Sequence, residues 1–451
     1  MKNIYLIGIG GIGMSAIARF YNHFGYNVSG YDRTKSQLTA ELESEGIRIH
    51  YEDCPSLVPE DTENTLVIYT PAIPDTLKEI QLVHKKGYRI IKRSRALGEI
   101  ATDKKCLAVS GTHGKTTTST LLAHILTASG KGCNAFLGGI SKNYDTNLLL
   151  SREDTLVAEA DEFDRSFLQL FPDIAVVTAM DADHLDIYGD VSHVREAFVA
   201  FGMQVKKALI VKKGLETYFN AASARVYTYS YDDSTADFHA ADIELRTGGY
   251  LSFSIVTPMG VIPDCTVGVP GWVNVENAVA ATASATIFGV PAEEIRKALK
   301  SFCGVKRRFD IHINTERCTY VDDYAHHPAE LAAAISSIRN IFPGRKITGV
   351  FQPHLYTRTR DFKDEFAASL SLLDEVILLP IYPAREQAIE GVSSETILEK
   401  ITCPRKKICQ KDELISEISS RDIEILCTFG AGDIDRLCPQ IENALKERFS
   451  C

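Results

Sequence analysis

Residues 111–117 read Gly111-Thr112-His113-Gly114-Lys115-Thr116-Thr117. The apolar run 106–109 before them is typical of a buried parallel strand, and the segment 118–126 after them has helical periodicity. A strand, a glycine loop, a Gly-Lys-Thr sequence and a helix together predict a phosphate cradle made of backbone N–H groups and a helix N-terminus. Lys115 would neutralise phosphate oxygens there, and Thr116 could bind Mg2+. We therefore predict a nucleoside triphosphate site of shortened form, since the usual pattern has a glycine where this chain has Val109.

Length and composition narrow the class of protein. The chain has 451 residues, for which about three domains are expected. Its net charge of -10 argues against a nucleic acid or an anionic membrane as the main partner. Eleven cysteines without a C-x-x-C pair fit a reducing cytoplasm better than a disulfide framework. No apolar run reaches transmembrane length and the N-terminal one is too short for a signal peptide, so we expect a soluble, cytoplasmic protein.

Residues 1–102 begin with a pattern typical of dinucleotide-binding folds. A short apolar run leads into a glycine loop and a helical segment, and the next strand ends in an acid about 20 residues beyond the glycines. Such a loop would bind a pyrophosphate and the acid a ribose hydroxyl, and NAD and a UDP-sugar offer both groups. A turn that only packs helix on strand is the third possibility. The candidate binding residues are Gly10, Gly11, Gly13, Asp32 and Arg93. Arg93, at the end of the predicted strand 90–93, is either a phosphate ligand or a surface charge.

Residues 103–307 form the segment that contains the phosphate loop. Two apolar runs, 155–158 and 174–178, each lead into a cluster of acids. Carboxylates at the ends of parallel strands beside a phosphate loop are placed to hold a metal, and Glu159 is our first choice for a ligand. His184 lies in the second cluster and is a ligand, an indirect partner or a helix cap, because Mg2+ prefers oxygen.

A loop leading into a small-residue helix follows near residue 270. Asn274 and Asn277 share one face of its first turn, where their amides would read an adenine edge or cap the helix. The paired cations Arg307 and Arg308 then mark a hinge, with one of the two arginines able to reach the nucleotide.

Residues 308–451 repeat the alternation of strands and helices, which predicts a third α/β unit with a parallel sheet. The predicted strands are 319–321, 346–351, 375–379 and 423–427, and polar residues cluster after them, where such sheets bind ligands. Arg358 and Arg360 could fix a carboxylate or could be surface charges.

Taken in order, these motifs resemble those of the Mur ligases of bacterial cell-wall synthesis over nearly the full chain. The resemblance rests on residues 8–15, 111–117, 159–162, 183–184, 274–278, 307–309, 322–328, 354–360 and 430–434. It implies three domains: a Rossmann-like domain for a UDP-sugar, a central P-loop domain for ATP, and a Rossmann-like C-terminal domain for an amino acid that closes over the middle one. It implies a ligase of peptidoglycan precursor synthesis, a process tied to cell shape, the cell cycle and cell division.

The resemblance also implies a reaction. ATP would phosphorylate the lactyl carboxylate of UDP-N-acetylmuramate, and the amine of L-alanine would attack the resulting acyl phosphate to give an amide and phosphate. Carried over by motif, Lys115 would stabilise the transferring phosphate, and Thr116, Glu159 and His184 would hold two Mg2+ ions. The ATP site would comprise Gly111, Thr112, His113, Gly114, Lys115, Thr116, Thr117, Asn274, Asn277, Arg308 and Asp323. His326, His354 and Arg358 would face the acyl phosphate and L-alanine.

Three alternatives stay open. A recycling ligase of the same family would attach a preformed peptide to the same UDP-sugar. A nucleotide-gated binding or regulatory protein would keep the sites without the chemistry, although retention of Lys115, Thr116, Glu159 and His184 counts against it. A dehydrogenase agrees with the first forty residues and disagrees with the phosphate loop. We expect a monomer or a homodimer.

Overall fold

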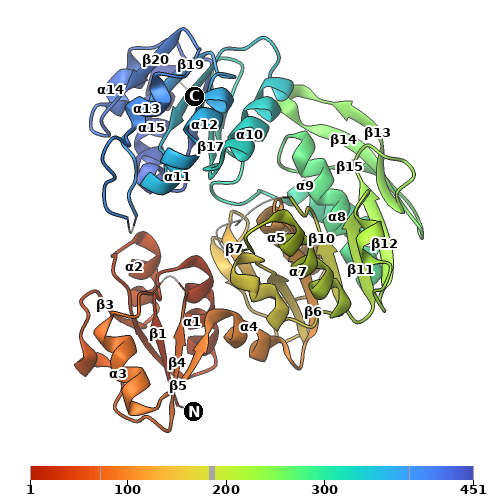
Figure 1. Ribbon diagram of the computed structural model, residues 1–451. Coiled ribbons are helices and arrows are strands. Elements are labelled where there is room, and N and C mark those ends of the chain that lie inside the picture. The colour runs from red at the N-terminus through yellow and green to blue at the C-terminus, as the bar shows by residue number, and fades with distance from the viewer. Residues whose placement is uncertain (1, 72, 182–187, 385, 450–451) are drawn as a thin grey trace. The chain divides into compact units, whose positions relative to one another are not determined.

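The computed structural model describes residues 2–71, 73–181, 188–384 and 386–449 (Figure 1). The described residues form three β-sheets, and their contacts divide the chain into two compact units. The first unit comprises residues 1–243, 252–268 and 274–303, and the second comprises 244–251, 269–273 and 304–451. The predicted α/β fold with three sheet-containing parts is confirmed. The boundaries at residues 102 and 307 stay a prediction.

The first sheet has five parallel strands in the order β3-β2-β1-β4-β5, which matches five of the six strands of the dinucleotide-binding sheet. The strands are β1 (Asn3–Ile7), β2 (Asn27–Tyr31), β3 (Arg48–His50), β4 (Thr65–Tyr69) and β5 (Arg89–Lys92). The helices are α1 (Ile12–His23), α2 (Gln37–Ser44), α3 (Lys78–Lys86) and α4 (Arg93–Ala101). Arg93 is therefore the first residue of a helix, and the strand predicted to include it ends one residue earlier.

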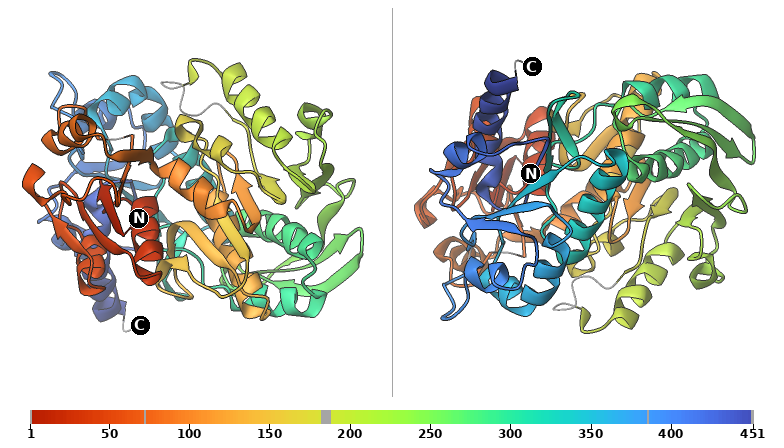
Figure 2. Two further views of the ribbon diagram at one scale, coloured as in Figure 1. Left: turned by 90° about the horizontal axis from the view of Figure 1, so that it is seen from below. Right: turned by 90° about the horizontal axis from the view of Figure 1, so that it is seen from above.

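The second sheet has ten strands in the order β15-β14-β13-β12-β11-β10-β6-β9-β7-β8. Its strands are β6 (Lys105–Ser110), β7 (Asn134–Ser141), β8 (Thr146–Leu149), β9 (Thr155–Glu159), β10 (Ile174–Val177), β11 (Ala208–Lys212), β12 (Arg225–Ser230), β13 (Phe238–Leu245), β14 (Leu251–Thr257) and β15 (Gly260–Thr266). Its helices are α5 (Lys115–Ala128), α7 (Val191–Met203), α8 (Trp272–Phe288) and α9 (Ala292–Ser301), with a short helical turn η2 (Phe163–Gln169). Figure 2 shows helices on both sides of this sheet. Residues 106–109 of β6 and all four residues of β10 are apolar and buried because of this cover.

The first two sheets belong to one unit, and polar contacts join them. Asn147, at the start of β8, donates to the Ile12 carbonyl oxygen at 2.6 Å and to Ser15 Oγ at 2.9 Å. Its own amide oxygen accepts a hydrogen bond from Arg19 Nη1 at 2.6 Å. Buried apolar residues of α1 and α4 share one core cluster with residues of β6, β9 and α7. The glycine loop before α1 is thus fixed relative to the central sheet.

The third sheet has six strands in the order β16-β17-β21-β18-β19-β20, all parallel except the edge strand β16. Its strands are β16 (Asp310–Asn314), β17 (Thr319–Asp323), β18 (Ile347–Phe351), β19 (Glu375–Leu378), β20 (Arg405–Ile408) and β21 (Ile425–Phe429). Its helices are α10 (Pro328–Ile341), α11 (Tyr356–Asp361), α12 (Lys363–Leu370), α13 (Ser394–Leu398), α14 (Leu414–Ser419) and α15 (Cys438–Phe449). Separate apolar clusters cover its two faces. Because five of the strands are parallel, their carboxyl ends and the polar residues that follow them meet at one edge of the sheet.

Candidate active site

The predicted phosphate loop lies between β6 and α5, as the sequence indicates. Gly111 has a φ of 134°, and a Cβ there would stand 2.0 Å from Thr178 Oγ1. Gly114 precedes α5 with a φ of 78°, and its Cβ would stand 2.9 Å from Asn277 Oδ1. Both positions require glycine, because the chain turns through the left-handed region while neighbouring side chains press against it. The loop is therefore tight even without the glycine that the longer pattern carries.

Lys115 is the first residue of α5, and its ammonium group is held at two points. Nζ donates to the Gly111 carbonyl oxygen at 2.6 Å and to Glu162 Oε1 at 2.8 Å. Burial acts to lower the pKa of Lys115, but the carboxylates of Glu162, Asp161 and Glu159 outweigh it and raise that pKa. Burial in turn raises the pKa of Glu162, against the opposing effect of Lys115. The lysine is therefore a fixed, permanent positive charge beside the phosphate loop.

Thr116 and Glu159 form the oxygen-rich part of the site. Thr116 Oγ1 donates to Glu159 Oε1 at 3.1 Å, and the Gly138 backbone N–H donates to Glu159 Oε2 at 3.1 Å. A Cβ at Gly138 would lie 2.3 Å from both carboxylate oxygens, so this glycine leaves the space that Glu159 occupies. A hydroxyl and a carboxylate beside nucleotide phosphates suit Mg2+, which usually takes one or two carboxylates together with phosphate oxygens. His184, the third predicted metal ligand, lies outside the described residues.

The remaining loop residues have local roles that the structure makes visible. The Thr112 hydroxyl accepts a hydrogen bond from the Asp181 backbone N–H at 3.2 Å. His113 is half-exposed and lies 3.7 Å from Asp181 Oδ2. Asn277 is buried in α8, and its Oδ1 accepts from Thr118 Oγ1 at 3.1 Å. The structure thus brings Asn277 to the phosphate loop, where it supports the loop from α8. Contact with adenine by Asn274 and Asn277 stays a prediction, and so does the part of Thr117.

The predicted UDP-sugar residues come together at the N-terminal end of α1. The Gly10 backbone N–H donates to Asp32 Oδ2 at 2.8 Å, which fixes the acid against the glycine loop. Gly11 is the N-cap residue of α1. A Cβ at Gly13 would stand 2.8 Å from Arg93 Nη1, so the guanidinium of Arg93 lies directly on the first turn of that helix. A cation beside exposed helix N–H groups is a suitable receptor for a pyrophosphate.

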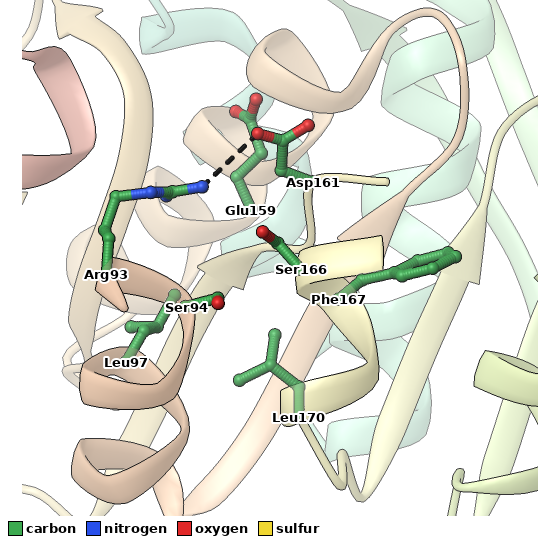
Figure 3. A pocket seen from close by; sticks show the side chains of 8 residues that line it. All are labelled: Arg93, Ser94, Leu97, Glu159, Asp161, Ser166, Phe167 and Leu170. Atoms are coloured by element: carbon green, nitrogen blue, oxygen red, sulfur yellow. Dashed lines mark hydrogen bonds and ion pairs between the residues drawn. The ribbon is translucent and has the colours of Figure 1, made fainter. Parts of the chain in front are cut away.

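Arg93 also connects this loop to the central sheet. Its Nη2 lies 3.4 Å from Asp161 Oδ2, and Asp161 follows β9 two residues after Glu159. Figure 3 shows Arg93 reaching from α4 towards Asp161, with Glu159 beside it. These residues border a small pocket. It is lined by Arg93, Ser94, Leu97, Glu159, Asp161, Ser166, Phe167 and Leu170. Residues of the predicted sugar site and of the predicted metal site therefore line the same pocket.

The second unit places Asp323, Arg308 and Tyr324 together at the end of β17. Asp323 Oδ2 accepts from the Phe309 N–H at 2.7 Å and Oδ1 accepts from the Ala325 N–H at 2.8 Å. Burial raises the pKa of Asp323 to about 6, although Arg308 and these hydrogen bonds oppose the shift. The Arg308 guanidinium lies 5.0 Å from the centre of the Tyr324 ring. Contact of Asp323 with a ribose and of Arg308 with phosphate stays a prediction.

The two hinge arginines differ in their surroundings. Arg307 Nε lies 3.3 Å from Asp322 Oδ2, and its other nitrogens donate to the carbonyl oxygens of Gly430 and Gly432. The nearby Asp322 and Asp435 carboxylates keep the pKa of Arg307 raised although burial acts against it. The guanidinium of Arg307 is thus bound to groups of the second unit, which makes Arg308 the better of the two candidates for binding the nucleotide.

His326, His354 and Arg358 form a cluster after β17 and β18. The two histidine rings are 6.0 Å apart at 78°, and His326 Nδ1 lies 3.0 Å from the Tyr324 carbonyl oxygen. Burial lowers the pKa of His326, and Arg358 adds to that effect, while Glu330 opposes it. Arg358 Nη1 is buried with no hydrogen-bond partner among the described residues. Arg360 instead pairs with Asp361 at 2.7 Å and is exposed. A carboxylate of a small ligand would satisfy Arg358.

Several contributors to these sites were not singled out in the sequence. Asp161 and Glu162 stand in the acidic run after β9, but only the fold shows that one meets Arg93 and the other Lys115. Gly138 had a signal, since a glycine inside a strand often marks a close approach. Tyr382 had none; its ring stacks on His354 at 5.8 Å and 19°.

Comparisons with known proteins agree with this geometry. Three family models match: the Mur ligase family catalytic domain at residues 3–105, the Mur ligase middle domain at 109–285, and the Mur ligase glutamate ligase domain at 307–432. The UDP-N-acetylmuramate–L-alanine ligase of Parabacteroides distasonis is 49% identical over 98% of this chain and 97% of its own length. That of Phocaeicola vulgatus is 50% identical over 99% of both chains.

Solved structures give the same result. The UDP-N-acetylmuramate-alanine ligase of Thermotoga maritima superposes with a TM-score of 0.84 at 26% identity, over 99% of both chains. A murein peptide ligase of Psychrobacter arcticus has a TM-score of 0.74 at 22% identity over 99% of both chains, which shows a shared fold. Family models that together cover most of the sequence, and relatives near half identity over its full length, leave one assignment: the chain belongs to the Mur ligase family.

Proposed function

We propose that this protein joins L-alanine to the lactyl carboxylate of UDP-N-acetylmuramate at the expense of ATP, as a step of peptidoglycan precursor synthesis. The observation that carries the proposal is the pocket in the first unit that borders both the proposed UDP-sugar site and the proposed ATP site. Lys115, Thr116 and Glu159 are suited to a triphosphate, and Arg93 on the glycine loop is suited to a pyrophosphate. The choice of amine rests on the named function of relatives near half identity.

In the first step, the γ-phosphoryl group of ATP passes to the lactyl carboxylate, which yields an acyl phosphate and ADP. A carboxylate is a poor electrophile until its oxygen becomes part of a leaving group. Phosphoryl transfer needs positive charge on the transferring oxygens and an in-line arrangement. Lys115 supplies fixed charge because Glu162 and the Gly111 carbonyl hold its ammonium group in place.

Thr116, Glu159 and His184 would hold two Mg2+ ions with the phosphates. The bound ions would supply charge neutralisation during transfer. Gly111, Thr112, His113, Gly114 and Thr117 complete the phosphate loop in this proposal. Asn274 and Asn277 would contact adenine, Asp323 the ribose and Arg308 the phosphates.

In the second step, the amine of L-alanine attacks the acyl carbon, an amide bond forms and inorganic phosphate leaves. Arg358 would bind the carboxylate of L-alanine through its buried, unsatisfied Nη1. The ammonium group must first lose a proton, and His326 or His354 is the proposed acceptor. The lowered pKa of His326 keeps its ring neutral near pH 7, the form that can accept a proton.

We further propose three domains, 1–102 for the UDP-sugar, 103–307 for ATP and 308–451 for the amino acid. Gly10, Gly11, Gly13, Asp32 and Arg93 would bind the UDP-sugar. Every cysteine among the described residues is free, which supports a reducing compartment such as the cytoplasm. The described part of the chain has no helix long and apolar enough to cross a bilayer. We propose a monomer or a homodimer.

The test is phosphate release from ATP and Mg2+ with UDP-N-acetylmuramate, adding L-alanine, glycine, L-serine or the cell-wall tripeptide separately. We expect turnover with L-alanine to exceed the others by far. Best turnover with the tripeptide would make the protein a recycling ligase. Tight binding of the UDP-sugar without turnover for any amine would make it a regulator.

A further inference from the structure

Three carboxylates of the acidic run 159–162, at the end of β9, contact three different functional groups. Glu159 accepts from the Thr116 hydroxyl, Asp161 pairs with Arg93, and Glu162 pairs with Lys115. The first and third partners belong to the phosphate loop. The second belongs to α4 and lies against the other glycine loop. Asp161 is therefore the member of the run that faces the proposed sugar site.

The two ends of the Arg93 guanidinium have different neighbours. Nη1 lies against Gly13, whereas Nη2 lies 3.4 Å from Asp161 Oδ2. An arginine has five N–H donors in a rigid fork, so one edge can stay on a carboxylate while another binds a phosphate. Both side chains are partly shielded from solvent, with 21% of Arg93 and 34% of Asp161 exposed. Asp161 is thus placed to hold Arg93 rather than to compete with a pyrophosphate.

We propose that Asp161 is a positioning residue that holds the guanidinium of Arg93 on the first turn of α1, ready for the pyrophosphate of the UDP-sugar. This inference rests on the proposed function, because it assigns that site its ligand. A preorganised arginine costs less side-chain entropy on binding than a free one. Asp161 therefore contributes to the affinity for the UDP-sugar although it does not touch it.

Asp161→Asn is a suitable test variant because we expect it to keep the local turn. Asp161 Oδ1 accepts from the Phe163 N–H at 3.1 Å, and an asparagine oxygen can accept the same hydrogen bond. The matched control is Asp164→Asn. Asp164 pairs with Lys92 at 2.7 Å, so this second ion pair joins the same two segments one residue away from Arg93.

The experiment is calorimetric titration of the full chain with UDP-N-acetylmuramate, without ATP. Relative to the wild type, we expect Asp161→Asn to bind about fivefold more weakly, the effect of a partly exposed ion pair. We expect Asp164→Asn to stay within about twofold of the wild type. In an Arg93→Ala background the Asp161→Asn change should have no further effect, because it acts through Arg93. Affinity for Mg2+ and ATP alone should be unchanged.

The inference would be overturned by unchanged or tighter binding of UDP-N-acetylmuramate in Asp161→Asn, by an equal loss in Asp164→Asn, or by a loss that persists without Arg93. A change in Mg2+ and ATP affinity alone would instead make Asp161 part of the phosphate site and also overturn it. A wild-type protein that does not bind UDP-N-acetylmuramate would refute the proposed function and this inference with it.

Discussion

Replacing Lys115 by methionine should expose how strongly this lysine is coupled to Glu162. Glu162 is 1% exposed and Lys115 is 14% exposed, so their pair at 2.8 Å is largely removed from water. Removing one partner of a buried pair leaves an unpaired charge and costs about 3–5 kcal/mol. We therefore expect Lys115→Met to destabilise the first unit by about 3 kcal/mol. We also expect phosphate release to fall at least a hundredfold, about the effect of losing one preorganised donor.

The pH dependence gives the prediction its sign. Burial already raises the pKa of Glu162, and without Lys115 nothing of equal strength opposes it. An acid whose folded-state pKa exceeds its unfolded value stabilises the fold below the unfolded pKa, and this stability is lost as pH rises through the folded pKa. At pH 5 Glu162 can take up a proton at small cost. The destabilisation by Lys115→Met should therefore be larger at pH 8 than at pH 5.

The assay is urea denaturation of wild type and variant at both pH values, followed by far-UV circular dichroism. The control is the double variant Lys115→Met, Glu162→Gln, which removes both charges and should recover most of the lost stability while staying inactive. UDP-N-acetylmuramate binding should survive in Lys115→Met, since its site uses other residues. Equal stability of Lys115→Met and wild type at pH 8, or a larger loss at pH 5, would refute the reasoning.

Three further predictions follow from single contacts. Gly138→Ala places a Cβ 2.3 Å from both Glu159 oxygens, so the rate of phosphate release should fall about a hundredfold and saturate at a higher Mg2+ concentration. The circular dichroism spectrum should be unchanged. Normal kinetics would contradict the role of Glu159. Arg358→Ala should raise the KM for L-alanine at least tenfold and leave the KM for ATP unchanged. The control is Arg360→Ala, because Arg360 already pairs with Asp361, and its KM for L-alanine should stay within about twofold of the wild type. Equal effects of the two variants would contradict the assignment. Burial raises the pKa of Asp323 to about 6, so the charged form of Asp323 lowers the stability of the fold as pH rises through 6. Between pH 4 and pH 8, the free energy of unfolding of Asp323→Asn should therefore rise by up to about 3 kcal/mol relative to that of the wild type, measured by urea titration. A difference between variant and wild type that does not change with pH would contradict the raised pKa.

Local patterns explain what the sequence could predict. The phosphate loop and the glycine loop before α1 are continuous segments, and their strand, turn and helix follow from neighbouring residues. Arg93 was predicted at a strand end and proved to start α4, because element boundaries depend on tertiary packing. The order of the motifs supplied the family, which the comparisons confirm.

Contacts between segments that are distant in the sequence could not be predicted from it. Nothing in the acidic run distinguishes Asp161 from Glu162, and the choice of Arg93 or Lys115 as partner appears only in the folded chain. The same holds for the two hinge arginines, where Arg307 turns inward to Asp322 and Arg308 lies over Tyr324. Both oxygens of Asp323 accept backbone hydrogen bonds, which no spacing indicates, and its contact with a ribose stays a prediction.

The most direct test of the proposed function uses UDP-N-acetylmuramate labelled with 18O in the lactyl carboxylate, together with ATP, Mg2+ and L-alanine. Mass spectrometry of the products should show a UDP-sugar that has gained one alanine residue and inorganic phosphate that carries one 18O atom, because the carboxylate oxygen leaves with the phosphoryl group. A UDP-sugar of unchanged mass would contradict the ligase activity, and alanine addition with unlabelled phosphate would contradict the acyl phosphate.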